Sequence, residues 1–299
     1  MNDFQLIESP VLSRSGGGRA GELRPDESAL INGWSDALLL RVNSRGQVVV
    51  SSDSRLVFGV TTELGSEPVR GAVFLGLREG RHVWAVRVTS LAGTLSELRM
   101  LGGALDDVDA GLLTGSVAAL NWHDHAGFSA IDGAPTEPTM SGWSRISKTT
   151  GHEEFPRTDP AVICLVHDGA NHVLLARQPT WPSHRFSILA GFVEAGESLE
   201  TCVIREIKEE VGIDVHGVHY LGSQPWPFPR SLMLGFAAIG NPADGLRYAD
   251  GEIAEAVWFS KDEVREALAL GDWASMVDAP LLLPGSNSIA RGMLESWVG

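Results

Sequence analysis

The chain has 299 residues, 43% of them hydrophobic and 20% charged, so it is long enough for two domains that each bury a core. Its formal net charge of −15 argues against sequence-independent binding along a nucleic-acid backbone, which depends on many Lys and Arg contacts. No apolar run is long enough to span a bilayer, so no membrane partner is expected.

The first part of the chain contains short apolar runs that are typical of strands. Residues 37–42 and 47–50 flank a turn and predict one β-hairpin, and residues 71–77 and 82–88 predict another. Residues 95–120 have the spacing of a helix. Taken alone, none of these segments contains residues that indicate catalysis or binding.

The second part alternates strand-like and helical segments. Strands are predicted at residues 161–166, 173–176, 187–190, 218–221, 232–239 and 256–259, and helices at 261–270 and from about residue 289. We therefore predict an α+β protein with three parts. These are a mainly antiparallel β domain with helix over residues 1–125, a loop-like connector over 126–154 and a second domain over 155–299.

Two cysteines, Cys164 and Cys202, provide no disulfide framework. The sequence Met1–Pro10 also lacks the basic residues and apolar stretch of a secretory signal. Both features favour a cytoplasmic protein.

One further helix is predicted just after residue 198. Ser198 suits an N-cap, and Gly212 stands where a glycine ends a helix. The apolar residues of this segment share an arc that can face a core: Val203, Ile204, Ile207 and Val211.

Three carboxylates, Glu206, Glu209 and Glu210, share another arc of roughly 100° on this helix. Like charges so placed repel each other, and clustered carboxylate oxygens suit hard cations such as Mg²⁺ or Mn²⁺. A merely solvated acidic face is the alternative, and the flanking residues decide against it.

The flanking residues follow a fixed spacing. Gly191 is followed after five residues by Glu197, and after seven more by Arg205-Glu206, an apolar residue, any residue, Glu209-Glu210, any residue, Gly212 and an apolar residue. This pattern resembles the Nudix box, with every fixed position filled. The resemblance implies an α/β/α sandwich for residues 155–299.

A second motif lies at residues 223–231, SQPWPFPRS, where three prolines stiffen a loop that carries Trp226 and Phe228. The alternative interpretation is a purely structural loop, a rigid connector whose aromatic residues are buried. Together with the acidic box, however, the loop resembles the NADH pyrophosphatase subgroup of the Nudix hydrolases. The resemblance covers about residues 120–299 well and the first domain only loosely.

The resemblance implies the site residues. It makes Glu206, Glu209 and Glu210 catalytic, and it places metal ions on the carbonyl of Ala190 and on Glu206, Glu210 and Glu252. It implies substrate contacts by Phe155, Phe192, Gln224, Pro225, Trp226, Pro227, Phe228, Pro229, Arg230, Ser231, Ala290 and Arg99. Arg205 is expected to orient the glutamates.

One feature departs from the subgroup, whose members often carry a four-cysteine zinc ribbon between the domains. The corresponding positions here are Ser129, Asp132, Ser147 and Thr150, which cannot replace four thiolates around zinc. We therefore expect no structural zinc, with the connector held by packing of its aromatic residues Phe128 and Trp143.

The activity that the resemblance implies is hydrolysis of the diphosphate bond of NADH or NAD⁺ to AMP and nicotinamide mononucleotide, with two to three Mg²⁺ or Mn²⁺ ions. It also implies removal of a 5′ NAD cap from RNA held at its end, which avoids backbone binding by an acidic protein. The subgroup is typically a homodimer. Two alternatives remain: a Nudix hydrolase of ADP-ribose or dinucleoside polyphosphates, and a non-catalytic nucleotide sensor.

Overall fold

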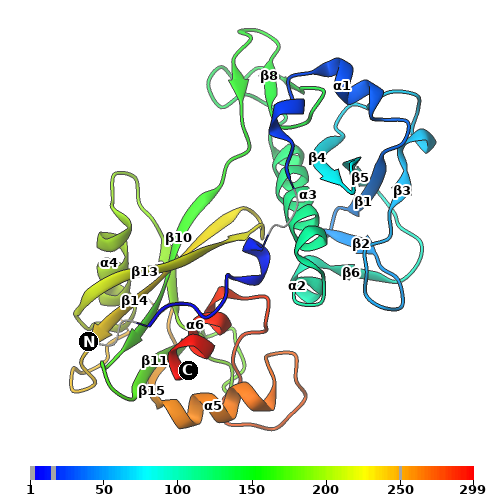
Figure 1. Cartoon of the computed structure of the whole chain (residues 1–299). Helices are drawn as coiled ribbons and strands as arrows, with labels where there is room; N and C mark the ends of the chain where they lie inside the picture. Colours follow the sequence, from blue (N-terminus) through cyan, green and yellow to red (C-terminus); the bar gives the residue numbers. More distant parts are fainter. Residues whose placement is uncertain (1–3, 15–17, 249–250) are drawn as a thin grey trace. The chain divides into compact units, whose positions relative to one another are not determined.

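The computed structural model describes residues 4–14, 18–248 and 251–299 and divides the chain into two compact units (Figure 1). One unit consists of Asp159–Gln224 and Ser231–Gly299 together with the segment that ends at Ser13. The other consists of Arg14–Thr158 and Pro225–Arg230. Each unit is thus assembled from separate stretches of chain, whereas each predicted domain is one continuous stretch. Among the described residues, no helix is both long and apolar enough to cross a membrane.

The unit formed mainly by Arg14–Thr158 contains a four-stranded sheet. Its order is β3 (Gly59–Val60), β1 (Leu38–Asn43), β5 (Arg81–Val88) and β4 (Val73–Arg78). Strands β1 and β5 are parallel and the other pairs antiparallel, so the predicted hairpin of β4 and β5 is confirmed. Helix α1 (Glu27–Asn32) begins at the N-cap Asp26. Large aromatic residues fill the core of this sheet: Trp34, Phe74 and Trp84.

The other predicted hairpin is wrong. Strand β2 (Gln47–Val49) pairs with β6 (Leu95–Glu97) rather than with β1. Both edges of β1 are already taken, by β3 and β5, so β2 finds its hydrogen-bond partner elsewhere.

The single helix predicted over residues 95–120 is also wrong. After β6 the chain forms the short helix α2 (Leu98–Leu101) and then α3 (Asp107–His125), which packs against β4 and β5. The break follows from local chemistry, since Gly102 and Gly103 disfavour a helix and Asp106 caps the start of α3 by accepting from the N–H of Asp109.

The predicted connector is more ordered than a loop. It contains a three-stranded antiparallel sheet of β7 (Thr136–Pro138), β8 (Arg145–Ser147) and β9 (Glu153–Glu154). The indole of Trp143 donates to the carbonyl of Phe74 at 2.5 Å. Phe128 is 69% exposed, so it does not anchor the connector as predicted.

Polar side chains join the two turns of this connector. The Oδ2 atom of Asp132 accepts from Ser147 Oγ at 2.7 Å and from Thr150 Oγ1 at 2.6 Å. In the first turn, Ser129 Oγ accepts from the N–H of Ile131 at 3.2 Å. One carboxylate therefore links the two turns.

The other unit is built on a six-stranded mixed sheet of order β13-β14-β10-β11-β15, with β12 also paired to β10. The strands are β10 (Asp159–His167), β11 (His172–Arg177), β12 (Leu189–Phe192), β13 (Val215–Trp226), β14 (Ser231–Gly240) and β15 (Glu255–Ser260). Its helices are α4 (Leu199–Val211), α5 (Lys261–Leu270) and α6 (Ile289–Val298).

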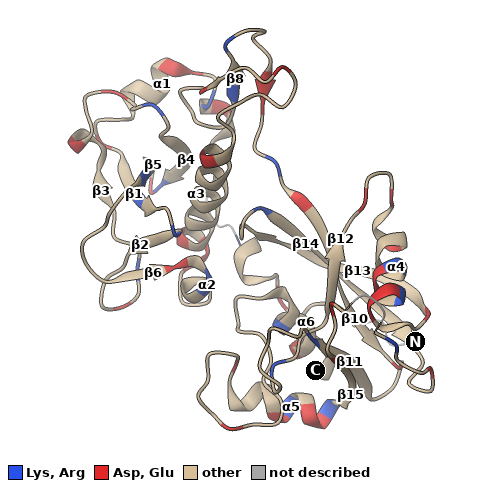
Figure 2. Ribbon diagram, turned by 180° about the vertical axis from the view of Figure 1, so that it is seen from behind, with Lys and Arg blue, Asp and Glu red and all other residues tan. Residues whose placement is uncertain are grey.

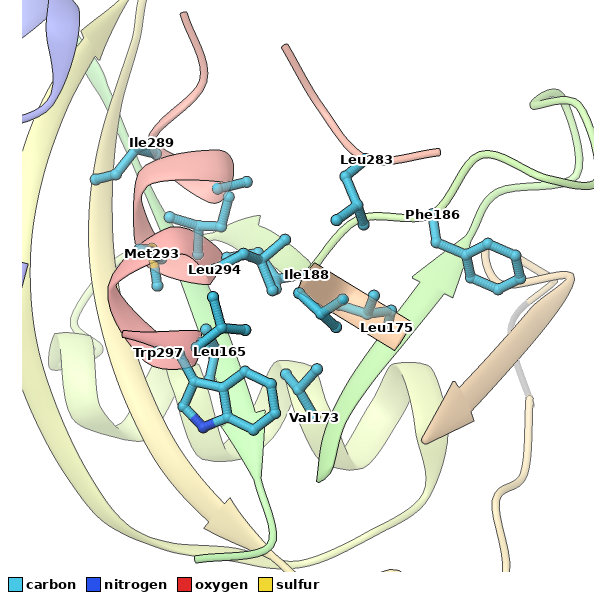
Figure 3. Packing of buried hydrophobic residues seen from close by; sticks show 14 of the residues in the cluster. Leu165, Val173, Leu175, Phe186, Ile188, Leu283, Ile289, Met293, Leu294 and Trp297 are labelled. Atoms are coloured by element: carbon cyan, nitrogen blue, oxygen red, sulfur yellow. The ribbon is translucent and has the colours of Figure 1, made fainter. Parts of the chain in front are cut away.

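Helices cover both faces of this sheet. On one face, α4 buries Cys202, Val203, Ile207 and Val211 against Leu174 and Phe236 of the strands. On the other, α5 and α6 bury apolar residues such as Met293, Leu294 and Trp297 against Leu165, Val173 and Leu175 (Figure 3). The predicted α/β/α sandwich is confirmed.

Candidate active site

Helix α4 carries the acidic cluster because its ends and its apolar stripe are both encoded locally. Ser198 Oγ accepts from the N–H of Thr201, and Gly212 ends the helix at φ 80°, a conformation that glycine adopts without strain. Of the predicted apolar arc, Val203, Ile207 and Val211 are buried, whereas Ile204 is 44% exposed. Burial of these three residues fixes how the helix is rotated, which leaves Glu206 and Glu209 on the same side. Acidic residues accordingly colour part of α4 in Figure 2.

The carboxylate of Glu206 lies directly over Gly191. A Cβ atom built on Gly191 would come within 1.9 Å of Glu206 Cδ and 2.2 Å of both carboxylate oxygens. Position 191 therefore needs a glycine for steric reasons, since any side chain there would displace the carboxylate. Gly191 follows Ala190 in β12, so the carboxylate and the Ala190 carbonyl belong to adjoining parts of the site.

Arg205 clamps the acidic residues to one another and to β12. Its guanidinium donates to both oxygens of Glu197 at 2.8 Å, and to Glu206 Oε1 and Glu209 Oε2 at 3.0 Å each. It also donates to the carbonyl of Phe192 at 3.1 Å. These hydrogen bonds lower the pKa of Glu197 to about 2 and raise the pKa of Arg205. The clamp therefore holds the side chains in one geometry, the role expected for Arg205.

The pKa of Glu206 is raised, in contrast to that of Glu197. Burial is the largest cause that raises the pKa of Glu206, and Arg205 opposes it. The nearby charges of Glu209 and Glu252 raise this pKa further, so Glu252 lies within electrostatic reach although it stands far along the chain. Glu252 is exposed, whereas Glu210 is only 6% exposed.

These residues fit a divalent cation. The charges of Glu209 and Glu252 act on Glu206, whose ionised form is destabilised by burial and by these neighbours, and a cation would reverse that penalty. Within the part of the chain that the structure describes, no three His, Cys, Asp or Glu side chains already surround one centre. Glu206 Oε1 instead accepts a hydrogen bond from Arg205 Nη1.

The remaining predicted residues of this unit differ in exposure. Phe192 is 60% exposed directly after Gly191. Gln224 is fully buried, and its Nε2 donates to the carbonyl of Asn287 at 2.9 Å. Ser231, at the start of β14, and Ala290, in the first turn of α6, are buried too. The Phe192 side chain is thus exposed for contact with substrate, whereas the side chains of Gln224 and Ala290 are buried.

The proline-rich loop Pro225–Arg230 belongs to the other unit. The rings of Trp226 and Phe228 meet edge to face with centroids 5.0 Å apart. The guanidinium of Arg99 lies 4.2 Å from the Phe228 centroid and 5.5 Å from that of Trp226. Arg99 and the loop, predicted from distant parts of the sequence, are therefore neighbours.

Phe155 occupies a different part of that unit. It is 62% exposed and lines an open pocket of about 460 Å³ together with Arg24, Met140 and Trp143. The guanidinium of Arg24 stacks over the Trp143 ring at 4.0 Å. Phe155 thus lies in an aromatic pocket of its own unit.

Sequence reasoning missed one residue at the loop. Asn121, near the end of α3, donates its side-chain amide to the carbonyls of Pro227 and Pro229. No motif signals it, because a single polar residue on a helix is ordinary and its partners are more than a hundred residues away.

The chain is similar to known proteins along most of its length. A family model described as "NUDIX domain" matches residues 157–278, and one described as "NADH pyrophosphatase-like rudimentary NUDIX domain" matches residues 27–122. The chain is 57% identical to proteins named NAD-capped RNA hydrolase NudC from Mycobacterium bovis and Mycobacterium tuberculosis, over 99% of this chain and 96% of theirs. It is 39% identical to the mitochondrial NAD(P)H pyrophosphatase NUDT13 of Mus musculus, over 70% of this chain and 60% of that protein.

Proposed function

Because the chain belongs to the NADH pyrophosphatase subgroup of the Nudix hydrolases, we propose that it hydrolyses the diphosphate bond of NADH and NAD⁺ to AMP and nicotinamide mononucleotide. We propose the same cleavage at the 5′ NAD cap of RNA, as the names of its mycobacterial relatives suggest. The observation that carries the proposal is the complete acidic cluster on α4, seated against Gly191 and clamped by Arg205.

The site residues have different roles in this reaction. The carboxylates of Glu206, Glu210 and Glu252, with the carbonyl of Ala190, would hold two to three Mg²⁺ or Mn²⁺ ions. When bound, such ions would neutralise the charge of the diphosphate and make water easier to deprotonate. One of Glu209 and Glu210 accepts the proton of the attacking water. Arg205 fixes the carboxylates before substrate arrives, so little reorganisation is needed during the reaction.

The aromatic residues of the proline-rich loop bind the bases of the dinucleotide. Trp226 and Phe228 offer flat surfaces to a base, and such stacking contributes ~1–3 kcal/mol per base while tolerating different bases. Binding through the terminal dinucleotide needs few contacts to the RNA backbone. An acidic protein with a net charge of −15 can therefore act on capped RNA.

The direct test is turnover of NADH with Mg²⁺ or Mn²⁺, followed by product analysis. Glu206→Gln and Glu210→Gln are expected to lower kcat by several orders of magnitude, because the amide lacks the negative charge that attracts the cation. Glu200→Gln, an exposed change on the first turn of the same helix, is the matched control and is expected to keep wild-type activity. Circular dichroism checks that all three variants fold.

The result also separates the alternatives. AMP and nicotinamide mononucleotide from NADH, at a higher kcat/KM than for ADP-ribose or dinucleoside polyphosphates, supports the proposal. A preference for either competitor contradicts it. Binding of nucleotides without turnover would indicate a sensor.

Assembly and location belong to the same proposal. We propose a homodimer, supported by the subgroup to which the chain belongs, and light scattering of the purified protein measures it directly. We also propose a cytoplasmic location, supported by two buried, unpaired cysteines, Cys164 and Cys202. Cell fractionation tests this location.

A further inference from the structure

The loop Pro225–Arg230 depends on outside donors to hold its backbone. Its three prolines have no N–H, and within the loop the N–H of Phe228 donates to the carbonyl of Trp226 at 2.7 Å. Pro227 is buried, so its carbonyl needs a donor from elsewhere in the chain, whereas Pro229 is exposed and its carbonyl can also bind water.

One side chain supplies both donors. Asn121 Nδ2 donates to the carbonyl of Pro227 at 3.1 Å and to that of Pro229 at 3.3 Å. These two carbonyls flank Phe228, so a single amide fixes the backbone on both sides of this aromatic residue.

A second residue fixes the orientation of that amide. Arg87 Nη2 donates to Asn121 Oδ1 at 2.9 Å, so the NH₂ group is the end that faces the loop. Arg87 itself is held by an ion pair with Asp124 at 2.7 Å and by a hydrogen bond to the carbonyl of Asn43 at 2.6 Å. The side chain of Arg87 is only 19% exposed, so it forms a fixed support between β5 and α3.

The aromatic side of the loop has its own support. Arg99, which follows the first residue of α2, places its guanidinium over the ring of Phe228 at 4.2 Å. Backbone and ring of Phe228 are therefore held by two different residues of Arg14–Thr158.

We propose that Asn121, oriented by Arg87, is a positioning residue for the dinucleotide: it holds the loop so that Trp226 and Phe228 are already placed to stack on a base. The inference rests on the proposed function of the loop and assigns a binding role to the N-terminal part of the chain. Preorganisation of this kind strengthens binding by removing the cost of ordering the loop.

The decisive variant is Asn121→Asp. It keeps the size of the side chain and gives Arg87 a charged partner, so the fold should be retained, but it removes both donors to the loop. Loss of two hydrogen bonds to carbonyls should raise the KM for NADH by about tenfold or more. The kcat should stay within about twofold, because the acidic cluster is unchanged.

Two controls accompany this variant. Asn32→Asp makes the same charge change on an exposed residue of α1 and should leave KM unaltered. Asn121→Ala also removes the donors without adding charge, so a rise in KM in both Asn121 variants excludes repulsion of the substrate as the sole cause.

A second readout does not depend on activity. Hydrogen–deuterium exchange at the N–H groups of Trp226, Phe228 and Arg230 should be faster in Asn121→Asp than in the wild type, while circular dichroism shows that the variant remains folded. Unaltered exchange together with an unaltered KM overturns the inference. If the wild type does not hydrolyse NADH, the proposed function fails, while faster exchange in the variant would still show that Asn121 holds the loop.

Discussion

At the scale of single residues, the most constrained pair is Gly191 and Glu206. The carboxylate fills the space that a side chain at position 191 would need. Proximity of this kind has two effects at once: it sets where the carboxylate oxygens lie, and it partly buries them, which raises the pKa of Glu206. The glycine of the box is thus a packing requirement of the acidic cluster and not a flexible joint.

Gly191→Ala tests this requirement. The added methyl group should push the Glu206 carboxylate away and lower kcat by at least about a hundredfold, since misplacement by about 1 Å is already costly in an active site. The melting temperature should change little, because the obstructing atoms belong to the end of a side chain.

The control is Gly245→Ala, where an added Cβ meets nothing within 4 Å. It should keep wild-type kinetics. Equal activity of Gly191→Ala and wild type would show that the position of Glu206 is not critical.

At the scale of elements, the connector shows how a turn pair can be joined without metal. Asp132 accepts hydrogen bonds from Thr150 and Ser147 and from the N–H of Ala134. These bonds favour the ionised carboxylate and lower the pKa of Asp132 to about 2. Four thiolates around zinc perform the same joining task in other proteins, with much greater strength.

The lowered pKa predicts a pH dependence with a definite sign. The folded state holds the Asp132 proton less tightly than the unfolded state does, so its stabilisation is complete above the unfolded pKa of about 4. This stabilisation should be lost as the pH falls from there to about 2. Asp132→Asn should therefore lower the urea midpoint at pH 6, and the difference from wild type should shrink at pH 3.

Trp143 fluorescence reports this transition within the same unit. Glu67→Gln, on an exposed residue, is the control and should show no comparable difference at either pH. Stoichiometric, tightly bound zinc in the purified wild type would contradict the view that Asp132 joins the turns without metal.

At the scale of the whole molecule, the acidic cluster and the proline-rich loop belong to different compact units, although both lie in one stretch of sequence. The loop continues from β13 into β14 of the sandwich, yet its own contacts are with α2 and α3. The N-terminal part therefore contributes to substrate binding in our proposal, in addition to having its own core.

Cation binding should couple to the stability of the whole fold. A ligand bound only by the folded state, at about 100 times its Kd, adds about 2.7 kcal/mol to the free energy of unfolding. Mn²⁺ should therefore raise the melting temperature of the wild type, and excess EDTA should reverse the shift and abolish NADH turnover without unfolding the protein.

Glu206→Gln serves as the comparison, since it removes one proposed ligand. Its melting temperature should respond less to Mn²⁺. An equal shift in this variant and in the wild type would place the bound cation elsewhere.

The sequence by itself determined those features that depend on neighbours in the chain. The ends of α4 follow from the local caps Ser198 and Gly212, and its apolar stripe follows from a period of about 3.6 residues. The spacing of the box then places its acids on one side of a helix. The hairpin of β4 and β5 is local for the same reason, since its strands are joined by a two-residue turn.

Only the tertiary structure decided which distant groups meet. Strand β2 pairs with β6 because both edges of β1 are occupied, and no local signal states which edge is free. The same holds for Glu206 against Gly191 and for Asn121 at the proline carbonyls. Periodicity and capping act within a few residues, whereas steric fit and the need to satisfy buried carbonyls act through space, so these contacts exist only once the chain has packed.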